Sequence, residues 1–453
     1  MRDDVVVGID IGSSGTKVLA YNRAGSVVEA RVVPTPMNRS EDGLDFPILE
    51  LLSAAEQALS EVIAAVGSVA GIGIASMGEV GTVLVNGELA DLHFPAWYDE
   101  RGAEIIAALE SARPVGELAA VTGGHARTTS TIAKLGWLAR YRGCPAGTFL
   151  GVAGALAWRL TGVAVQEAGL ASTSGAFDPV RSRYMRMPWN NAGLGFVSTP
   201  VVAPAGAGKS ASTVLARTLG LSSSCRVLVA GHDHPVAAVG SGALAGDVVH
   251  SVGTSEGLLV SISRGRLAAV GGAARLVRAG FTIETWPGAD DLLVMAEGLR
   301  PGLALQTLLG AAVADRAELD AAAPAPGVAP ELQRCDSLQL ERGDLGQHVG
   351  DAVTWASVID HYARMAADRE AALRAVSGAL GRTVLTGGGT RSPRWMAAKR
   401  WFGTHPQVVS NITETVTRGA AAITGAQLGW WPIAAAMPGN DTRPVPAPVG
   451  SGN

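Results

Sequence analysis

Two histidines flank a single aspartate in the hexapeptide AGHDHP, which spans residues 230–235. Histidine and aspartate are both zinc ligands, so His232, Asp233 and His234 form one candidate metal site, of the kind that a metal hydrolase uses. The alternative is one working carboxylate, Asp233, with neighbours that shape its pocket. Side chains alternate between the two faces of an extended strand. If residues 232–234 remain extended, both histidines point away from Asp233, which favours the single carboxylate.

A turn of glycine and hydroxyl residues follows an apolar run near the start of the chain, in DIGSSGTK (10–17). Small residues let backbone N–H groups approach phosphate oxygens, and hydroxyls add further donors. The carboxylate of Asp10, at the end of the apolar run, would hold Mg²⁺ through water. The alternative for this segment is a plain β-hairpin turn.

Two later segments repeat the combination of glycine and hydroxyl residues. SVGTSEG (251–257) lies between two apolar runs and echoes the first turn, and two such turns can clamp a polyphosphate. TGGGTRSPRW (386–395) has three consecutive glycines, whose conformational freedom usually serves a close approach, here by a nucleobase or ribose. A tight strand-to-helix turn, with Ser392 as the helix cap before Pro393, explains the same residues.

Polar side chains beside apolar runs also occur in SMGEVG (76–81) and PAWYDERG (95–102). Glu79 and Asp99 have the chemistry to bind polyol hydroxyls, and Trp97 the surface to stack on a carbon skeleton. Core packing for Trp97 and a solvated loop for the two acids are the alternatives. AGAGKS (205–210) is similar to the end of a nucleotide-binding Walker A loop, but Ala203 stands where that motif needs glycine, so a surface loop is predicted.

The elements that must position these residues alternate between strand and helix patterns. Alternation of this kind predicts an α/β fold. The expected strands are 5–12, 17–22, 26–34, 71–76, 226–231, 384–389 and the pair within 247–262; the expected helices are 48–66, 134–142, 156–162, 354–380 and one opened by Pro235. The second half of the chain restarts the opening pattern, which places a domain boundary near 242–246. A surface loop is expected at 321–331.

Bulk composition narrows the class of protein. The 453 residues suggest two domains, and 47% hydrophobic with 17% charged residues fits a packed globular chain. A net charge of −4 without a basic stripe makes nucleic acid an unexpected partner. We expect neither a secretory signal nor a membrane span. Three scattered cysteines without CxxC spacing favour a reducing cytoplasm.

The ordered set DIGSSGTK, SMGEVG, WYDER, AGHDH, SVGTS and TGGGTRSPRW resembles the FGGY family of carbohydrate kinases, within the actin-like ATPase superfamily. The resemblance covers residues 5 to 430. It implies ATP-dependent phosphorylation of a small sugar or polyol by two ribonuclease H-like domains that close on a cleft. The implied domains are residues 1–243 and 244–435. The tail at 436–453 is rich in Pro and Gly, and from this composition it is expected to be flexible.

The resemblance also implies roles for individual residues. Asp233 is expected to be the catalytic base, and Asp10 to belong to the Mg²⁺–phosphate site. The residues expected to bind ATP are Asp10, Gly12, Ser13, Ser14, Thr16 and Lys17 in the first loop, Gly253, Thr254 and Ser255 in the second, and Gly387, Gly388 and Gly389 at the adenosine site. The residues expected to contact or frame the substrate are Glu79, Trp97, Asp99, Arg101, Asp233 and His234.

This chain departs from the family pattern at three places. Ser251 stands where an acidic residue is usual, residues 317–350 lack a GER-like segment, and Met396 and Ala397 follow the tryptophan of the adenosine segment. A non-catalytic sugar or nucleotide sensor on the same fold is therefore the alternative to a kinase. The sequence does not name the sugar, and it leaves the oligomeric state open, with a homodimer among the alternatives.

Overall fold

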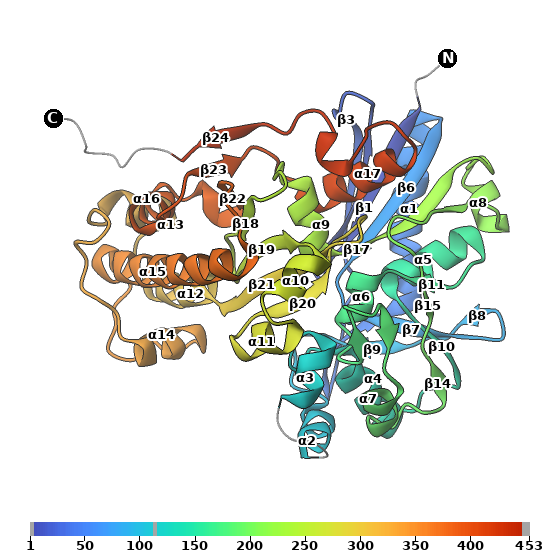
Figure 1. The fold of residues 1–453 in the computed structure, drawn as a ribbon, viewed down its shortest axis with the longest axis horizontal. Helices are drawn as coiled ribbons and strands as arrows, with labels where there is room; N and C mark the ends of the chain where they lie inside the picture. The colour runs from blue at the N-terminus through green and yellow to red at the C-terminus, as the bar shows by residue number, and fades with distance from the viewer. Residues whose placement is uncertain (1–3, 112–115, 446–453) are drawn as a thin grey trace. The chain divides into compact units, whose positions relative to one another are not determined.

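The structure, a computed structural model, describes residues 4–111 and 116–445 (Figure 1). Contacts divide the chain into two compact units. Unit 1 comprises Met1–Gly240, Ile262–Leu293 and Glu414–Gly439; unit 2 comprises Ser241–Ser261, Val294–Thr413 and Asn440–Asn453. The first change of unit lies beside the boundary expected near 242–246, whereas two later segments return to unit 1. The division into domains 1–243 and 244–435 stays a prediction.

Unit 1 is built on a six-stranded sheet with the order β16-β17-β6-β1-β2-β3. Its strands are β1 (Val5–Ile11), β2 (Gly15–Tyr21), β3 (Val27–Pro34), β6 (Val69–Ser76), β16 (Lys209–Ser210) and β17 (Arg226–His232). Strands β1, β6 and β17 are parallel neighbours, and β2, β3 and β16 add antiparallel pairs. The five long strands that the apolar runs predicted are confirmed.

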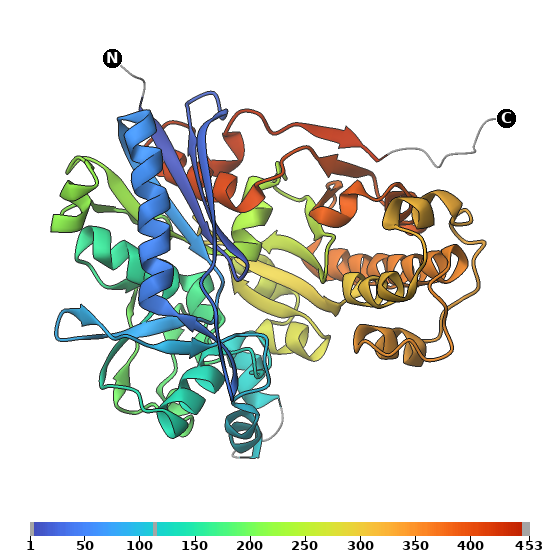
Figure 2. The ribbon, with the colours of Figure 1, turned by 180° about the vertical axis from the view of Figure 1, so that it is seen from behind.

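The two faces of this sheet are covered by different helices. Helix α1 (Ile48–Val66), confirmed at the predicted residues, buries Leu51, Leu52 and Leu59 in the larger core and runs beside β2 and β3 (Figure 2). Helix α17 (Thr415–Gln427) contacts β1 and β6 and packs Ala421 and Ala422 in a separate core cluster. A sheet covered on both faces explains why the strand β1 is apolar almost throughout.

Glycine in β1 allows α17 to lie directly on the strand. A Cβ atom added at Gly8 would lie 1.9 Å from the carbonyl oxygen of Thr417, so a larger residue at this position would push the helix away. Helix α9 (Asp233–Gly240) contacts the same helix. The carboxyl end of the sheet, α9 and the start of α17 therefore have fixed positions within unit 1.

Smaller elements complete unit 1. They include a sheet of the order β14-β10-β7-β8 and a three-stranded sheet of the order β4-β5-β9. The bounds of those used below are α2 (Ala103–Ser111), α4 (Thr131–Tyr141), α5 (Val152–Thr161), α6 (Ala168–Ser172), β5 (Gly43–Pro47) and β20 (Thr282–Thr285). Helices α4 and α5 confirm the helices expected around 134–142 and 156–162.

Unit 2 repeats the combination of a sheet with helices. Its neighbouring strands follow the order β21-β19-β18-β22-β23-β24. They are β18 (Val248–Ser251), β19 (Glu256–Ile262), β21 (Leu292–Leu299), β22 (Thr383–Thr386), β23 (Gln407–Ser410) and β24 (Thr442–Pro444). Helices α12 (Pro301–Ala311), α15 (Ala352–Ser377) and α16 (Pro393–Phe402) supply the rest of its core, with α12 beside α15 (Figure 1). The strand pair in 247–262 and the helix in 354–380 are confirmed.

The loop and tail predictions hold only in part. After α13 (Arg316–Ala322), residues 323–331 form the expected loop. The expectation of a flexible tail from residue 436 is wrong for β24, because Val408, Val409 and Ser410 of β23 pair with that strand. Its last part, 446–453, lies outside the described residues. In the part of the chain that the structure describes, no helix is long and apolar enough to cross a membrane.

Candidate functional site

The carboxyl ends of three parallel strands lie at one edge of the unit 1 sheet. In the strand register, Ile11 of β1 is the partner of Ser76 of β6, and Ser76 is the partner of His232 of β17. Ligands of open α/β sheets bind beyond the carboxyl ends of the strands. The alignment gathers Asp10, Glu79 and Asp233 at this edge, although they are far apart in the sequence.

Asp233 is the first residue of α9, so the helix starts two residues earlier than the predicted start at Pro235. The assumption that residues 232–234 remain extended is therefore wrong. The backbone N–H of His234 donates to Asp233 Oδ1 over 2.7 Å, and His232 Nε2 lies 3.2 Å from the same oxygen. Asp233 Oδ2 has no hydrogen-bond partner among the described residues. One oxygen of this carboxylate is thus fixed, and the other is available to accept a proton.

His232 lies between two carboxylates. Its Nδ1 is 3.4 Å from Glu284 Oε2, and its Nε2 faces Asp233. Burial alone would lower the pKa of His232, but the hydrogen bond and charge of Glu284, with the charges of Asp233 and Glu79, raise it to about 10. The imidazole is therefore a cation at neutral pH.

The three-ligand metal site gains no support from this geometry. The rings of His232 and His234 stack with centroids 5.6 Å apart. Across residues 4–111 and 116–445, no three His, Cys, Asp or Glu side chains converge in an arrangement that could hold a metal ion. His234 is exposed, and a role for it in binding substrate stays a prediction.

Two acids at the strand ends hold protons more tightly than usual. Burial, with the nearby charge of Asp233, raises the pKa of Asp10 to about 7. Burial likewise raises the pKa of Glu79 to about 7, although the His232 cation opposes the shift. Two carboxylates that share one low-dielectric site repel each other, and a cation placed between them would relieve the repulsion.

The first phosphate loop is only partly open to a ligand. Ser14 is exposed and Ser13 half-buried, whereas Thr16 is fully buried, with a hydroxyl that lacks a partner among the described residues. Lys17 is opposite Asp10 in the β1–β2 pair. Its ammonium group makes an ion pair of 2.7 Å with Glu414, so it must leave that carboxylate to reach a phosphate.

Asp99 and Arg101 lie in a network of ion pairs. Lys134 of α4 is fully buried, and its Nζ lies 2.8 Å from Asp99 Oδ1. Arg101 pairs with Asp99 over 2.5 Å and with Asp45 over 2.7 Å. Trp97 is half-buried against the larger core. These contacts tie the loop at 95–102 to α4 and β5, and direct substrate contacts by these residues stay a prediction.

Unit 2 brings the second and third glycine-rich segments together. The N–H of Val252 donates to the carbonyl of Thr386 over 2.8 Å, and the N–H of Gly389 donates to the carbonyl of Val252 over 2.9 Å. Gly387 has φ +95°, and a Cβ there would lie 2.6 Å from the Val252 oxygen. Thr254 and Ser255 are exposed beside this contact. The predicted phosphate loop at 253–255 and adenosine glycines at 387–389 are thus neighbours.

A buried charged cluster lies beside the loop at 253–255, because Glu256 directly follows that loop in the chain. Glu256 Oε2 is 2.7 Å from Lys399 Nζ and 3.2 Å from His250 Nε2, and all three side chains are buried. Burial would raise the pKa of Glu256, but the charges of Lys399 and His250 hold it below its usual value. The cluster ties α16 to strands β18 and β19, which carry the loop.

Sequence reasoning missed two acids near Asp233. Glu284 comes from β20, whose buried pattern in TIET contains a carboxylate, and this internal charge was the available signal. Glu167 is the N-cap of α6, where its Oε2 accepts from the N–H of Leu170 over 3.0 Å. Burial raises the pKa of Glu167 to about 7.

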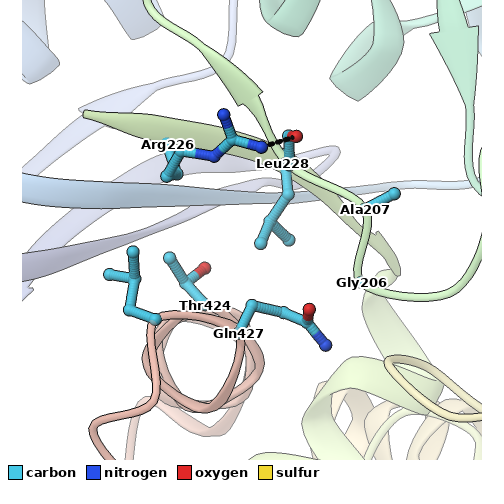
Figure 3. Close-up of a pocket in the computed structure, with 8 residues that line it drawn as sticks. Gly206, Ala207, Arg226, Leu228, Thr424 and Gln427 are labelled. Carbon is cyan, nitrogen blue, oxygen red and sulfur yellow. Dashed lines mark hydrogen bonds between the residues drawn. The ribbon is translucent and has the colours of Figure 1, made fainter. Parts of the chain in front are cut away.

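The segment similar to a Walker A loop lines a separate pocket of about 230 Å³ (Figure 3). Gly206, Ala207 and Gly208 face Thr424 and Gln427 of α17 across it. Arg226 at its wall donates to the carbonyl of Gly208 over 2.5 Å. Because Arg226 begins β17 and His232 ends it, about 20 Å of strand separates this pocket from Asp233. The pocket does not belong to the site at the strand ends.

The N-terminal domain of the FGGY family of carbohydrate kinases matches residues 5–240, more than half of this chain. The chain is 25% identical to L-fuculokinase from Escherichia coli (strain K12), over 96% of its own length and 93% of the relative's. It is 28% identical to L-fuculokinase from Salmonella typhi, over 57% of its own length and 57% of that relative's.

The fold is similar to that of xylulose kinase from Rhodospirillum rubrum. The TM-score is 0.78 at 19% sequence identity, with 99% of this chain and 95% of that chain covered. The likeness confirms the predicted α/β fold of the actin-like ATPase type. The predicted cleft between the domains stays a prediction.

Proposed function

The chain belongs to the FGGY family of carbohydrate kinases, and from this premise we propose that it transfers the γ-phosphoryl group of ATP to a hydroxyl of a small sugar or polyol. The observation that carries the proposal is the Asp233 carboxylate, which has one fixed oxygen and one open oxygen at the carboxyl edge of the sheet. Phosphoryl transfer needs positioning and charge stabilisation more than covalent help from the protein.

Asp233 acts as the general base. As the substrate oxygen attacks phosphorus, its proton passes to Asp233 Oδ2, while Oδ1 keeps the bond from the N–H of His234. His232 holds the base in place from the other side, and Glu284 in turn holds His232. The two are positioning residues, because they act through the Asp233 carboxylate.

Asp10 fits the role of a magnesium residue. Asp10 is half-buried near Asp233, and its pKa of about 7 indicates a site whose negative charge a cation would stabilise. Oxygen ligands suit Mg²⁺, which keeps several of its waters. When bound, Mg²⁺ would neutralise charge on the phosphates. Asp10 would hold it through water, and Lys17, once released from Glu414, would supply a further positive charge.

ATP binding is assigned to the glycine-rich segments. Ser13 and Ser14 in unit 1, and Thr254 and Ser255 in unit 2, offer hydroxyl and backbone donors in exposed or half-buried loops. Gly387 and Gly388 expose backbone that could carry the adenosine, whereas Gly389 is buried against Val252. We further propose that the two units close on ATP and sugar, which would exclude water and limit wasteful hydrolysis of ATP.

The acceptor is a sugar or polyol whose hydroxyls meet Glu79, Asp233 and His234. The relatives from Escherichia coli and Salmonella typhi carry the name L-fuculokinase, so L-fuculose is the first acceptor to test. Identity of 25–28% leaves the side chains that select a sugar free to differ. A panel of pentoses, hexoses, ketoses, tetritols and pentitols with ATP and Mg²⁺ would identify it through the release of ADP.

Asp233→Asn tests the base directly. With the best acceptor of the panel, kcat should fall at least a hundredfold, in line with the usual contribution of a general base, while ATP binding measured by calorimetry is retained. Asp290→Asn, at a side chain that is 93% exposed, is the matched control and should leave kcat unchanged. Near-normal turnover by the Asp233 variant would overturn the proposal. Binding of sugar and ATP by the wild-type protein without ADP release across the panel would support the sensor instead.

A further inference from the structure

The outer edge of β3 is open. This strand is the last in the order β16-β17-β6-β1-β2-β3, so only β2 pairs with it among the described strands. Open strand edges pair readily with other chains, and proteins usually cover or charge them. In the part of the chain that the structure describes, β2 and α1 are the elements with extensive contacts to β3.

The backbone of Ala30 faces away from β2. Its N–H donates to Glu29 Oε1 over 3.1 Å, and its carbonyl accepts from Arg31 Nη1 over 2.7 Å. Neither group is therefore used in the ladder between β2 and β3, although Ala30 is the register partner of Leu19. In an antiparallel ladder, a residue whose N–H and C=O both face outward can exchange two hydrogen bonds with one residue of a new strand.

One face of β3 also exposes apolar side chains. Val32 is 65% exposed and lies with Ala30 on the face that α1 does not cover, and Val28, which is 46% exposed, lies where β3 shifts register against β2. Glu29 and Arg31 lie on the other face, where Arg31 contacts Glu61 of α1 over 3.1 Å. Exposed valines at the open edge of a sheet favour association with another chain.

The sequence of β3 is complementary to itself. Residues 27–33 read VVEARVV, so the segment has the same pattern of residue types in both directions, except that Glu29 and Arg31 exchange places. Two antiparallel copies related by a two-fold axis at Ala30 would set Glu29 opposite Arg31 of the second copy. They would also bring Val32 of each copy near Val28 of the other, where β3 carries its register shift. Opposite charges and β-branched pairs are the cross-strand neighbours that stabilise a sheet.

We propose that β3 is the contact between two copies of this chain, paired antiparallel with Ala30 opposite Ala30 of the second copy. The two unit 1 sheets then continue as one sheet across the two-fold axis. The ion pair between Glu29 and Arg31, now within one strand, becomes two pairs between chains. An isologous contact of this kind closes after two copies and does not extend into a filament.

The contact is small, which sets the expected strength of the dimer. Seven residues on each side bury less than the roughly 1,200–2,000 Å² of a standard stable interface. The dimer is therefore concentration-dependent and exchanges with the monomer. Sedimentation equilibrium of the full-length protein from about 1 to 200 μM measures that balance, because the range spans the affinities expected for transient contacts.

Charge exchange tests the register. Glu29→Arg or Arg31→Glu alone places like charges opposite each other twice, and each should weaken the dimer at least tenfold. The double variant Glu29→Arg with Arg31→Glu restores both pairs and should dimerise as the wild type does. Ala30→Pro removes the outward N–H without touching the ladder to β2 and should give a monomer. Glu110→Arg, an equal charge change at an exposed position on α2, is the control.

Several results would overturn the proposal. They are a wild-type protein that is monomeric at every concentration, single charge variants that dimerise like the wild type, and a double variant that stays monomeric. Kinase activity is not the readout, so failure here does not affect the proposed function. Restoration by the double variant also excludes misfolding as the cause of dissociation in the single variants.

Discussion

Replacing Glu284 by glutamine removes the charge that holds His232 and keeps nearly the same shape. Glu284 is 8% exposed and its Oε2 lies 3.4 Å from His232 Nδ1. Glutamine still offers an oxygen to the imidazole, so the contact survives without the ionic attraction. The variant therefore separates the charge of Glu284 from its packing.

The structure sets the size of the effect. The pKa of His232 rises from 6.5 to about 10 even though burial opposes the rise. At about 1.4 kcal/mol for each pH unit, the difference corresponds to about 5 kcal/mol of preference for the protonated ring. Asp233 and Glu79 supply part of it and remain in the variant. We expect Glu284→Gln to lower the pKa of His232 by at least one unit, or about 1.4 kcal/mol.

Two measurements report the protonation of the His232 ring and its effect on catalysis. NMR titration of the histidine side chains, with the His232 signal assigned by its absence in His232→Gln, gives the pKa directly. The alkaline limb of kcat/KM should lie near pH 10 in the wild type, because a neutral His232 ring has lost its charge and can donate to only one of Asp233 and Glu284. The limb should move down by at least one unit in the variant, and Glu284→Asp should restore part of the difference.

Stability gives an independent check with a defined sign. The folded pKa of His232 exceeds its unfolded value, so its contribution to stability is full below pH 6.5, declines above that pH, and is lost above about pH 10. Glu284→Gln should therefore lower the free energy of unfolding most at pH 6 and hardly at all above pH 10.

A matched change elsewhere controls for the loss of a buried carboxylate. Glu56 of α1 is 11% exposed and pairs with Arg159 of α5 over 2.7 Å. Burial raises the pKa of Glu56 to about 7, and Glu56→Gln should leave the His232 titration where it is. An unchanged His232 pKa and an unchanged alkaline limb in Glu284→Gln would refute the reasoning, because Glu284 would then not be holding the cation.

Three further outcomes are expected. Lys399→Met should lower the free energy of unfolding by about 3–5 kcal/mol in urea titrations at pH 7, because it leaves Glu256 buried without its cation, and a smaller loss than about 1 kcal/mol would contradict the buried ion pair. Gly387→Ala should raise the Kd for ADP at least tenfold by calorimetry, because the new methyl group would meet the Val252 carbonyl at 2.6 Å; unchanged affinity would show that this backbone is not at the nucleotide. The acid limb of kcat/KM should lie below pH 7 with saturating Mg²⁺, because the cation favours the Asp10 carboxylate, and should move up toward pH 7 when Mg²⁺ is limiting; a limb independent of Mg²⁺ would contradict the role of Asp10.

The strands and helices that carry the site could be predicted because their signals are local. The apolar run at 5–12 and the helix at 48–66 follow from residue periodicity within one segment. Asp10 and Asp233 stand out because each ends such a run. The start of α9 at Asp233 was missed because the proline signal marks a favourable early helical position, which need not be the first residue.

Partners that are distant in sequence could not be predicted. Glu284 meets His232 across 52 residues of sequence, and the register of β20 beside α6 decides that contact. In the same way, Asp99 meets Lys134 through the packing of α4 on the loop at 95–102. Composition gives no hint that a lysine of an apolar helix will turn inward. Such pairs depend on tertiary packing, which no single segment encodes.

The return of α17 to unit 1 affects how the protein can be made. Val6, Leu19 and Tyr21, near the N-terminus, bury against Ala421 and Ala422, so that face of the first sheet stays uncovered until the ribosome has passed residue 439. At typical rates, synthesis of the 199 residues from Ser241 to Gly439 takes on the order of 10–40 s. During this time the nascent chain presents an apolar sheet face that invites chaperone binding. Because α17 lies near the end of the sequence, the sheet of the N-terminal half cannot be fully covered until the last tenth of the chain has been synthesised.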